Sequence, residues 1–200
     1  MAPNTPPSTA EDFSADPFRE LISPEIRELR FSARLAATQA LYQMDIAATG
    51  TADVLAEFES WWIGQEVEGV PFLPVDTALF HDLVQGLVRE QRTVDRLING
   101  SLTPGWPLTR ILPVLRAILR AGVCEMLVRP DIPPRVTIDE FVEVSRRFYD
   151  DDDPGPGNAA PPIIAPETGL VNAVLDAVAR ELRPEEMNKN ESKHPTHFRK

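Results

Sequence analysis

The sequence predicts an all-α protein, a compact bundle of about six or seven helices with disordered ends. In each long segment apolar residues recur at intervals of three and four, as in an amphipathic helix, and no segment shows the sustained alternation of a strand. The 200 residues are 42% hydrophobic and 26% charged, which is typical of a globular protein with a sizeable core. We therefore expect one helical domain at residues 25–183, between a disordered arm at 1–24 and a disordered tail at 184–200.

Residues 30–48, entered through Pro24 to Arg27, form the helix around which we expect the bundle to pack. One side of this helix carries small apolar residues that we interpret as a core stripe: Leu29, Ala33, Ala36, Ala40, Met44 and Ala47. The opposite side carries Arg27, Arg30, Arg34, Thr38 and Tyr42. We expect the first side to hold the fold by close helix packing, and the second to offer charge to an external ligand.

Five more helices are predicted downstream, each with its apolar residues on one face. They are expected at residues 52–63, 76–99, 113–128, 137–148 and 168–183, with a loop at 64–75 and a short helical piece at 108–112. Asp76 or Thr77 can cap the second of them, and Pro113 suits the first turn of the third. The prolines that follow end the third helix, and Thr137 to Glu140 matches a capping box that would begin the fourth.

Charge and cysteine content limit the kinds of function. Lys+Arg 20 against Asp+Glu 31 gives a net charge of -11, so any contact with nucleic acid must be local rather than a bulk electrostatic coating. The one cysteine, Cys124, can form neither an internal disulfide nor a metal cage, and a reducing, cytoplasmic setting is expected. No apolar run is long enough to span a membrane, and the N-terminus lacks the pattern of a secretory signal.

The stretch that begins at Asp150 is the least regular part of the interior. Four consecutive aspartates precede residues rich in proline and glycine at about 154–166, which we interpret as a loop insertion. The aspartates lack the glycine and distal glutamate of a calcium loop, and His194 and His197 lie in the predicted tail. The sequence therefore predicts no metal site and no cofactor. It also offers no nucleophile with an adjacent base, and we expect no enzyme.

Four stretches, in order and spacing, resemble the NusB family of bacterial transcription antitermination factors. They are ARLAATQALYQMDI from Ala33, RAILRAGVCEMLVRPDIPPRVTIDEFVEVSRRF from Arg116, DDDDP from Asp150 and GLVNAVLDAVARELRP from Gly169. The resemblance covers roughly residues 27–183 and implies a helical RNA-binding protein without catalytic activity. It further implies pairing with a ribosomal small-subunit protein, also called NusE. The pair would bind the boxA element of single-stranded nascent RNA and bring it to an elongating RNA polymerase, chiefly on ribosomal RNA operons.

The resemblance also implies an RNA-binding surface. The family's arginine-rich N-terminal motif falls on Arg30 and Arg34, with Arg27 one turn earlier, and these guanidinium groups would contact phosphates. The remaining residues expected on this surface are Arg120, Leu170 and Asn172. The chain departs from the family at Phe31 and Ser32, where further basic residues are common, and at Leu170, where an aromatic residue is common. Asn172 has an alternative role, a hydrogen bond within the first turn of its own helix.

For the protein partner, the resemblance implies contacts by Tyr42, Arg116 and Glu125. Tyr42 has an alternative role as a half-buried core tyrosine. Arg116 and Arg120, four residues apart, either extend the cationic surface or pair with local acids.

Two rival functions follow from the same residues. The departures at Phe31 and Leu170, the insertion and the negative charge suggest a protein-interaction module that keeps the fold and has lost RNA recognition. The RNA-positioning domain of a ribosomal RNA cytosine methyltransferase has a similar fold, but such an enzyme needs a cofactor domain after it, and here only a tail is expected. Whether the free protein is a monomer or a homodimer stays open.

Overall fold

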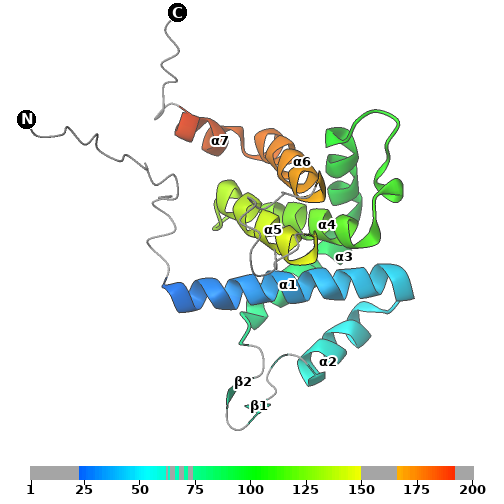
Figure 1. Ribbon diagram of the computed structural model, residues 1–200, viewed down its shortest axis with the longest axis vertical. Helices are drawn as coiled ribbons and strands as arrows, with labels where there is room; N and C mark the ends of the chain where they lie inside the picture. The colour runs from blue at the N-terminus through cyan, green and yellow to red at the C-terminus, as the bar shows by residue number, and fades with distance from the viewer. Residues whose placement is uncertain are drawn as a thin grey trace, which may run out of the picture.

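Seven α-helices build the part of the chain that the computed structural model describes (Figure 1), and the predicted all-α fold is confirmed. The described residues are 23–61, 63, 66–67, 70–71, 74–149 and 166–191. The helices are α1 (Pro24–Ala47), α2 (Thr51–Trp61), α3 (Thr77–Ser101), α4 (Pro113–Val128), α5 (Pro134–Tyr149), α6 (Pro166–Leu182) and α7 (Pro184–Glu191), with a 3-10 turn at Leu108–Arg110. None of these helices is long and apolar enough to cross a membrane.

Helix α4 is the centre of the bundle, in contact with α1, α3, α5 and α6. Small residues let its neighbours approach closely: a Cβ added at Gly122 would lie 2.9 Å from Leu175 Cδ2 of α6, and one at Gly86 of α3 would lie 3.1 Å from Cys124 Sγ. The Cys124 thiol donates to the Leu83 carbonyl oxygen at 3.5 Å, and burial raises its pKa to about 12. This thiol is therefore part of the core and not a reactive group.

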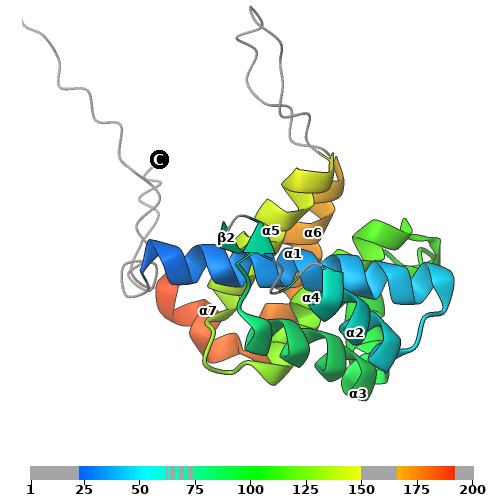
Figure 2. The same cartoon turned by 90° about the horizontal axis from the view of Figure 1, so that it is seen from below.

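Helix α1 lies across the bundle, and Figure 2 shows it from a second direction. Its alanine stripe is buried at Ala33, Ala36 and Ala40, as predicted, whereas Ala47 at its end is exposed. The buried surface of α1 is wider than the stripe, however, because α3, α4 and α5 all pack against this helix. Arg34 and Thr38, which we expected on an outward face, are both buried.

The starts of three helices follow the chemistry of their first residues. Ser23 caps α1, since its Oγ accepts from the Ile26 amide at 3.4 Å, and Asp76 caps α3 by accepting from the Leu79 amide at 3.0 Å. Pro113 occupies the first turn of α4, where its missing amide hydrogen costs nothing. The predicted starts of α3 and α4 are thereby confirmed, and α1 begins at Pro24.

The start of α5 and the loop at 64–75 differ from the prediction. Helix α5 begins at Pro134, one turn before the predicted capping box, because Thr137 and Glu140 direct their side chains to groups inside the protein. The predicted loop at 64–75 contains a two-residue antiparallel hairpin, β1 (Glu66–Val67) and β2 (Val70–Pro71).

The predicted tail is helical over its first part. Helix α7 packs against α5 and α6, and Met187 is fully buried. Arg183 ties this corner to the proline turn by donating to the Ile132 and Pro130 carbonyl oxygens at 2.7 and 3.0 Å, and Arg135 donates to the Met187 carbonyl oxygen at 3.1 Å. The described fold therefore includes α7, beyond the predicted limit of the helical domain at residue 183.

Some predictions lie outside the described residues. These are the arm at 1–22, the aspartates and insertion at 150–165, and the end of the tail with His194 and His197. Within the described part of the chain, no group of three or more His, Cys, Asp or Glu is arranged to hold a metal ion.

Candidate nucleic-acid interface

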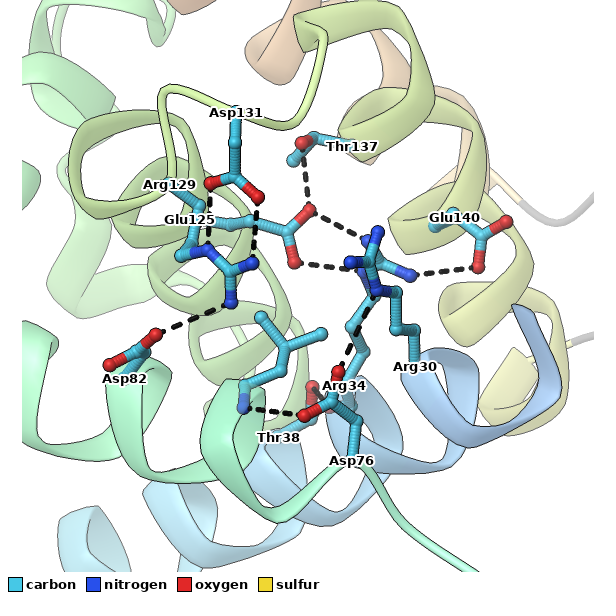
Figure 3. A network of polar contacts seen from close by, with 11 residues as sticks. Arg30, Arg34, Thr38, Asp76, Asp82, Glu125, Arg129, Asp131, Thr137 and Glu140 are labelled. Carbon is cyan, nitrogen blue, oxygen red and sulfur yellow. Dashed lines mark hydrogen bonds and ion pairs between the residues drawn. The ribbon is translucent and has the colours of Figure 1, made fainter. Parts of the chain in front are cut away.

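Arg34 lies at the centre of a buried polar cluster (Figure 3), which we call the Arg34 cluster and define as Arg34, Glu125, Thr137 and Glu140. Its Nε and Nη2 donate to the two carboxylate oxygens of Glu125 at 2.8 and 3.0 Å, a bidentate pair. Its Nη1 donates to Glu140 Oε2 at 3.1 Å. One guanidinium thus joins α1 to both α4 and α5.

The carboxylate of Glu125 has a further partner. Thr137 Oγ1 donates to Glu125 Oε1 at 2.8 Å, and both residues are fully buried. On α1, Thr38 Oγ1 donates to the Arg34 carbonyl oxygen at 2.9 Å. A buried charge is tolerable only when it is paired and hydrogen-bonded, and these bonds supply that condition.

The Arg34 cluster corrects two expectations about contact with ligands. Only 2% of the Arg34 side chain is exposed and none of Glu125, so neither group touches a molecule outside the fold. Both groups can be buried because the attraction between the two charges offsets the cost of removing each of them from water. Direct phosphate contact by Arg34 and direct partner contact by Glu125 are therefore replaced by a role in joining helices.

Arg30 lies one turn before Arg34 and is partly accessible to solvent. Its side chain is 24% exposed, and its Nε lies 3.6 Å from Asp76 Oδ2 at the start of α3 (Figure 3). The Asp76 carboxylate also accepts from the Leu79 amide at 3.0 Å, so it serves the cap of α3 as well. Arg30 is thus held by one long ion pair, which a stronger anion such as phosphate can replace. Arg27, a further turn outward, is half-buried.

Arg116 and Arg120 of α4 pair with local acids, one of the two alternatives that the sequence left open. Arg120 makes a bidentate pair with Asp95 at 2.8 and 2.9 Å, and its Nη1 lies 3.2 Å from Asp45 Oδ1. Arg116 donates through Nε to Asp45 Oδ2 at 2.9 Å and through Nη1 to the Ile111 carbonyl oxygen at 3.4 Å. These arginines join α1, α3 and α4 and are mostly covered.

Arg129 belongs to another ion-pair group, at the end of α4. It makes a bidentate pair with Asp131 at 2.8 and 2.7 Å and lies 3.3 Å from Asp82 Oδ2 of α3 (Figure 3). The hydrogen bonds from Arg129 hold the pKa of the Asp131 carboxyl below its usual range, and the same bonds raise the pKa of Arg129. This turn therefore keeps its charges matched at neutral pH.

The structure adds a residue that the sequence reasoning missed. Arg147, in the last turn of α5, is 55% exposed, and its guanidinium carbon lies over the Phe31 ring of α1 at 5.7 Å from the ring centroid. Its neighbour Arg146 is also exposed. The sequence signal was a pair of arginines at a helix end, but nothing local to them pointed to Phe31, more than a hundred residues earlier.

The start of α6 lies beside this same end of α5. Ser145 Oγ and Thr168 Oγ1, both buried, are 3.2 Å apart and join the two helices. Leu170 packs partly against the core, and Asn172 is exposed. The structure therefore brings the expected surface residues of α6 to the end of α5 that reaches α1.

Tyr42 lies in the second half of α1, away from these groups. It is 37% exposed, and Ile46 one turn later is 56% exposed. Together with Phe58 and Glu57 of α2 they line an open, largely apolar groove of about 390 Å³ between α1 and α2. Tyr42 thus lies at the surface of this groove with 37% of the residue exposed.

Comparison with known proteins gives consistent matches over most of the chain. The model of the NusB family matches residues 32–159. The transcription antitermination protein NusB of Rhodopseudomonas palustris (strain TIE-1) is 51% identical over 160 residues, which are 80% of this chain and 84% of that protein.

Solved structures show the same fold. T. maritima NusB aligns with a TM-score of 0.56 and 28% identity, covering 84% of this chain and 98% of that one. A structure of the antitermination factors NusB and NusE in complex with dsRNA aligns with a TM-score of 0.57 and 19% identity, over 76% of this chain and 96% of that one. The latter likeness is evidence for the fold alone.

Proposed function

Because this chain belongs to the NusB family, we propose that it is an RNA-binding transcription antitermination factor. In this proposal it pairs with the ribosomal small-subunit protein NusE in the cytoplasm, and the pair binds boxA-type single-stranded RNA in nascent ribosomal transcripts. Contact with the elongating RNA polymerase is then indirect, through the assembled complex. The related proteins supply the antitermination role, and a protein of similar fold has been solved with NusE and dsRNA.

The observation that carries RNA binding is the partly exposed side chain of Arg30, of which 24% is accessible. It lies on α1 next to Arg27, and its ion pair with Asp76 is long, at 3.6 Å. A charge-assisted bond to phosphate is shorter and stronger than such a pair. An RNA phosphate can therefore bind Arg30 in place of Asp76. The ion pairs of the Arg34 cluster, which hold α1 in the bundle, stay intact.

The partner surface in this proposal is the groove beside Tyr42. Its exposed apolar residues, Tyr42 and Ile46, are of the kind that bury well in a protein interface, with Gln43 and Glu57 as a polar margin. Gln43 donates to Glu57 at 2.6 Å across the groove, so the margin is already ordered. This surface and the arginines Arg27 and Arg30 lie on different halves of α1, which allows both ligands to bind at once.

The test of RNA binding is a gel-shift titration with NusE present, comparing a boxA-type RNA with a scrambled RNA of equal length. We expect tighter binding to the boxA-type RNA. Arg30→Ala should lower the affinity and reduce the slope of log K against log salt by roughly 0.7 to 1, the loss of about one phosphate contact. Equal affinity for both RNAs would contradict sequence recognition.

Arg96→Ala is the matched control for Arg30→Ala. Arg96 is a more exposed arginine, and it too has a long ion pair, at 3.9 Å from Glu181. It lies 20 residues beyond Asp76, roughly 30 Å along α3. The affinity and the salt slope should not change in this variant. An equal effect of both variants would point to general electrostatics instead of a site.

The partner surface is tested by pull-down and calorimetry with NusE. Ile46→Asp should weaken binding at least about tenfold, because it places a charge in an apolar contact. Val88→Asp, at an exposed valine of α3, is the control and should bind normally. Partner binding without any preference between RNAs would favour the rival function, a protein-interaction module of the same fold.

A further inference from the structure

Phe31 and Arg147 form a contact that neither the ion pairs nor the core requires. Phe31 packs partly against the core, and the guanidinium of Arg147 lies over its ring at 5.7 Å from the centroid. Two helices far apart in sequence, α1 and α5, meet there at the surface. The contact thus holds a long, otherwise mobile side chain in one place.

The neighbouring acid does not account for this arrangement. Arg147 Nε lies 3.7 Å from Glu143 Oε1, one turn earlier on α5, and both side chains are about half exposed. Exposed ion pairs of this spacing contribute little, so Glu143 alone would leave Arg147 in several rotamers. The ring of Phe31 is the feature that selects one.

The guanidinium carbon of Arg147 lies 5.7 Å from the centroid of the Phe31 ring, and 55% of the Arg147 side chain is exposed. The side chain therefore contacts Phe31 and is still accessible to a ligand. Unpaired RNA bases stack on arginine planes as they do on aromatic rings, and this stacking is tolerant of base identity. A base in that position would also place its phosphate near the charge of Arg147.

We propose that Arg147, held by Phe31, is a stacking platform for an unpaired RNA base. This inference rests on the proposed RNA-binding function and deepens it. The phosphates next to the stacked base reach Arg27 and Arg30 on the adjoining surface of α1. Phe31 then contributes by positioning Arg147 and not by charge.

The experiment uses the full chain with NusE and a boxA-type RNA that carries 2-aminopurine at successive unpaired positions, one per RNA. Stacking quenches the fluorescence of this base, so we expect quenching on binding at one position or at two adjacent ones. Arg147→Ala and Arg147→Lys should both abolish the quenching and lower the affinity about fivefold or more, because lysine keeps the charge but has no plane. Phe31→Leu should do the same while retaining apolar packing.

Arg180→Ala is the matched control. Arg180 is a similarly exposed arginine in the last turn of α6, paired at 2.7 Å with Asp176 one turn earlier. Quenching and affinity should match the unmodified protein. Thermal unfolding of every variant is measured alongside, and each should stay within about 2–3 °C of the unmodified protein.

The outcomes separate this inference from the proposed function. If Arg30→Ala weakens binding while Arg147→Lys retains both quenching and affinity, the stacking platform is overturned and RNA binding stands. If the boxA-type RNA is bound no more tightly than the scrambled RNA with NusE present, both the stacking platform and the proposed RNA-binding function are overturned. If Phe31→Leu keeps the quenching, the positioning role of Phe31 is overturned.

Discussion

Arg34 and Arg30 are one helical turn apart on α1 and have opposite surroundings. Arg34 meets two carboxylates, from α4 and α5, and is 2% exposed, whereas Arg30 meets one carboxylate at 3.6 Å and is 24% exposed. The difference arises from the neighbouring helices and not from α1. It teaches that an arginine row on one helix can serve the fold at one position and a ligand at the next.

The largest expected effect is on stability, at Arg34. Arg34→Ala should lower the free energy of unfolding by about 3–5 kcal/mol, because Glu125 and Glu140 remain buried without their counter-charge. Urea denaturation followed by circular dichroism measures it. A loss below about 1 kcal/mol would mean that the cluster relaxes to solvent and that the contrast with Arg30 is weak.

Thr137→Val should cause the next largest loss of stability. The change keeps the shape and removes the hydroxyl that donates to Glu125, and it should cost about 1–3 kcal/mol. Thr137→Ser, which keeps a hydroxyl, is the control in the same denaturation series and should lose clearly less. Equal losses in the two variants would show that packing of the threonine methyl, and not the hydrogen bond, is what matters at this position.

Arg120→Ala tests a case between buried and exposed. Its bidentate pair with Asp95 is mostly covered, with 13% of the Arg120 side chain exposed, so we expect a loss of about 1 kcal/mol. The loss should shrink when denaturation is repeated in 1 M NaCl, because salt screens partly exposed pairs. For Arg34→Ala the loss should hardly change with salt, and a similar salt dependence in both would remove the distinction.

Arg30→Ala should change stability by no more than about 0.5 kcal/mol, since its ion pair is long and partly exposed. The same variant should lower RNA affinity. Its effect on stability is therefore small and its effect on binding large, whereas Arg34→Ala should mainly lower stability. Arg30→Lys, which keeps a charge, should recover part of the affinity. A stability loss comparable to that of Arg34→Ala would place Arg30 within the structural network.

The smallest effect concerns pH. The folded-state pKa of Asp131 is lowered, chiefly by hydrogen bonds from Arg129, so the pair stabilises the fold above the unfolded pKa of about 3.9. This contribution is lost as pH falls through the lower, folded pKa. Asp131→Asn should therefore be less stable than the unmodified protein at pH 6. The difference in melting temperature between the two should become smaller as the pH is lowered from 6 to 3. A constant deficit would exclude this linkage.

One error of sequence interpretation is instructive at Thr137 and Glu140. Their spacing is that of a capping box, and local rules predict that they cap a helix. In the structure both side chains belong to the Arg34 cluster: Thr137 donates to Glu125 and Glu140 accepts from Arg34. The helix begins earlier, at Pro134. The buried charge of Arg34 competes with the start of the helix for these polar side chains. A local sequence pattern carries no information about Arg34, which lies about a hundred residues earlier.

The surface contact of Phe31 with Arg147 could not be read from the sequence either. In the sequence Phe31 is a departure from a basic motif, and no local pattern marks Arg147 as its partner. Their contact depends on how α5 crosses α1, which is set by packing in the core. The docking of α7 through Met187 has the same origin, because eight residues of polar sequence give little helical signal by themselves.

By itself, the sequence determined the helical class, the starts of α3 and α4, the alanine stripe of α1 and the family. These follow from local periodicity, from capping and proline chemistry, and from motifs that need no knowledge of distant contacts. Only the tertiary structure decided which arginines of α1 face inward, which residues of α5 reach α1, and where the domain ends. Those outcomes depend on the balance between desolvating a charge and pairing it, which is settled only when partners distant in sequence are brought together.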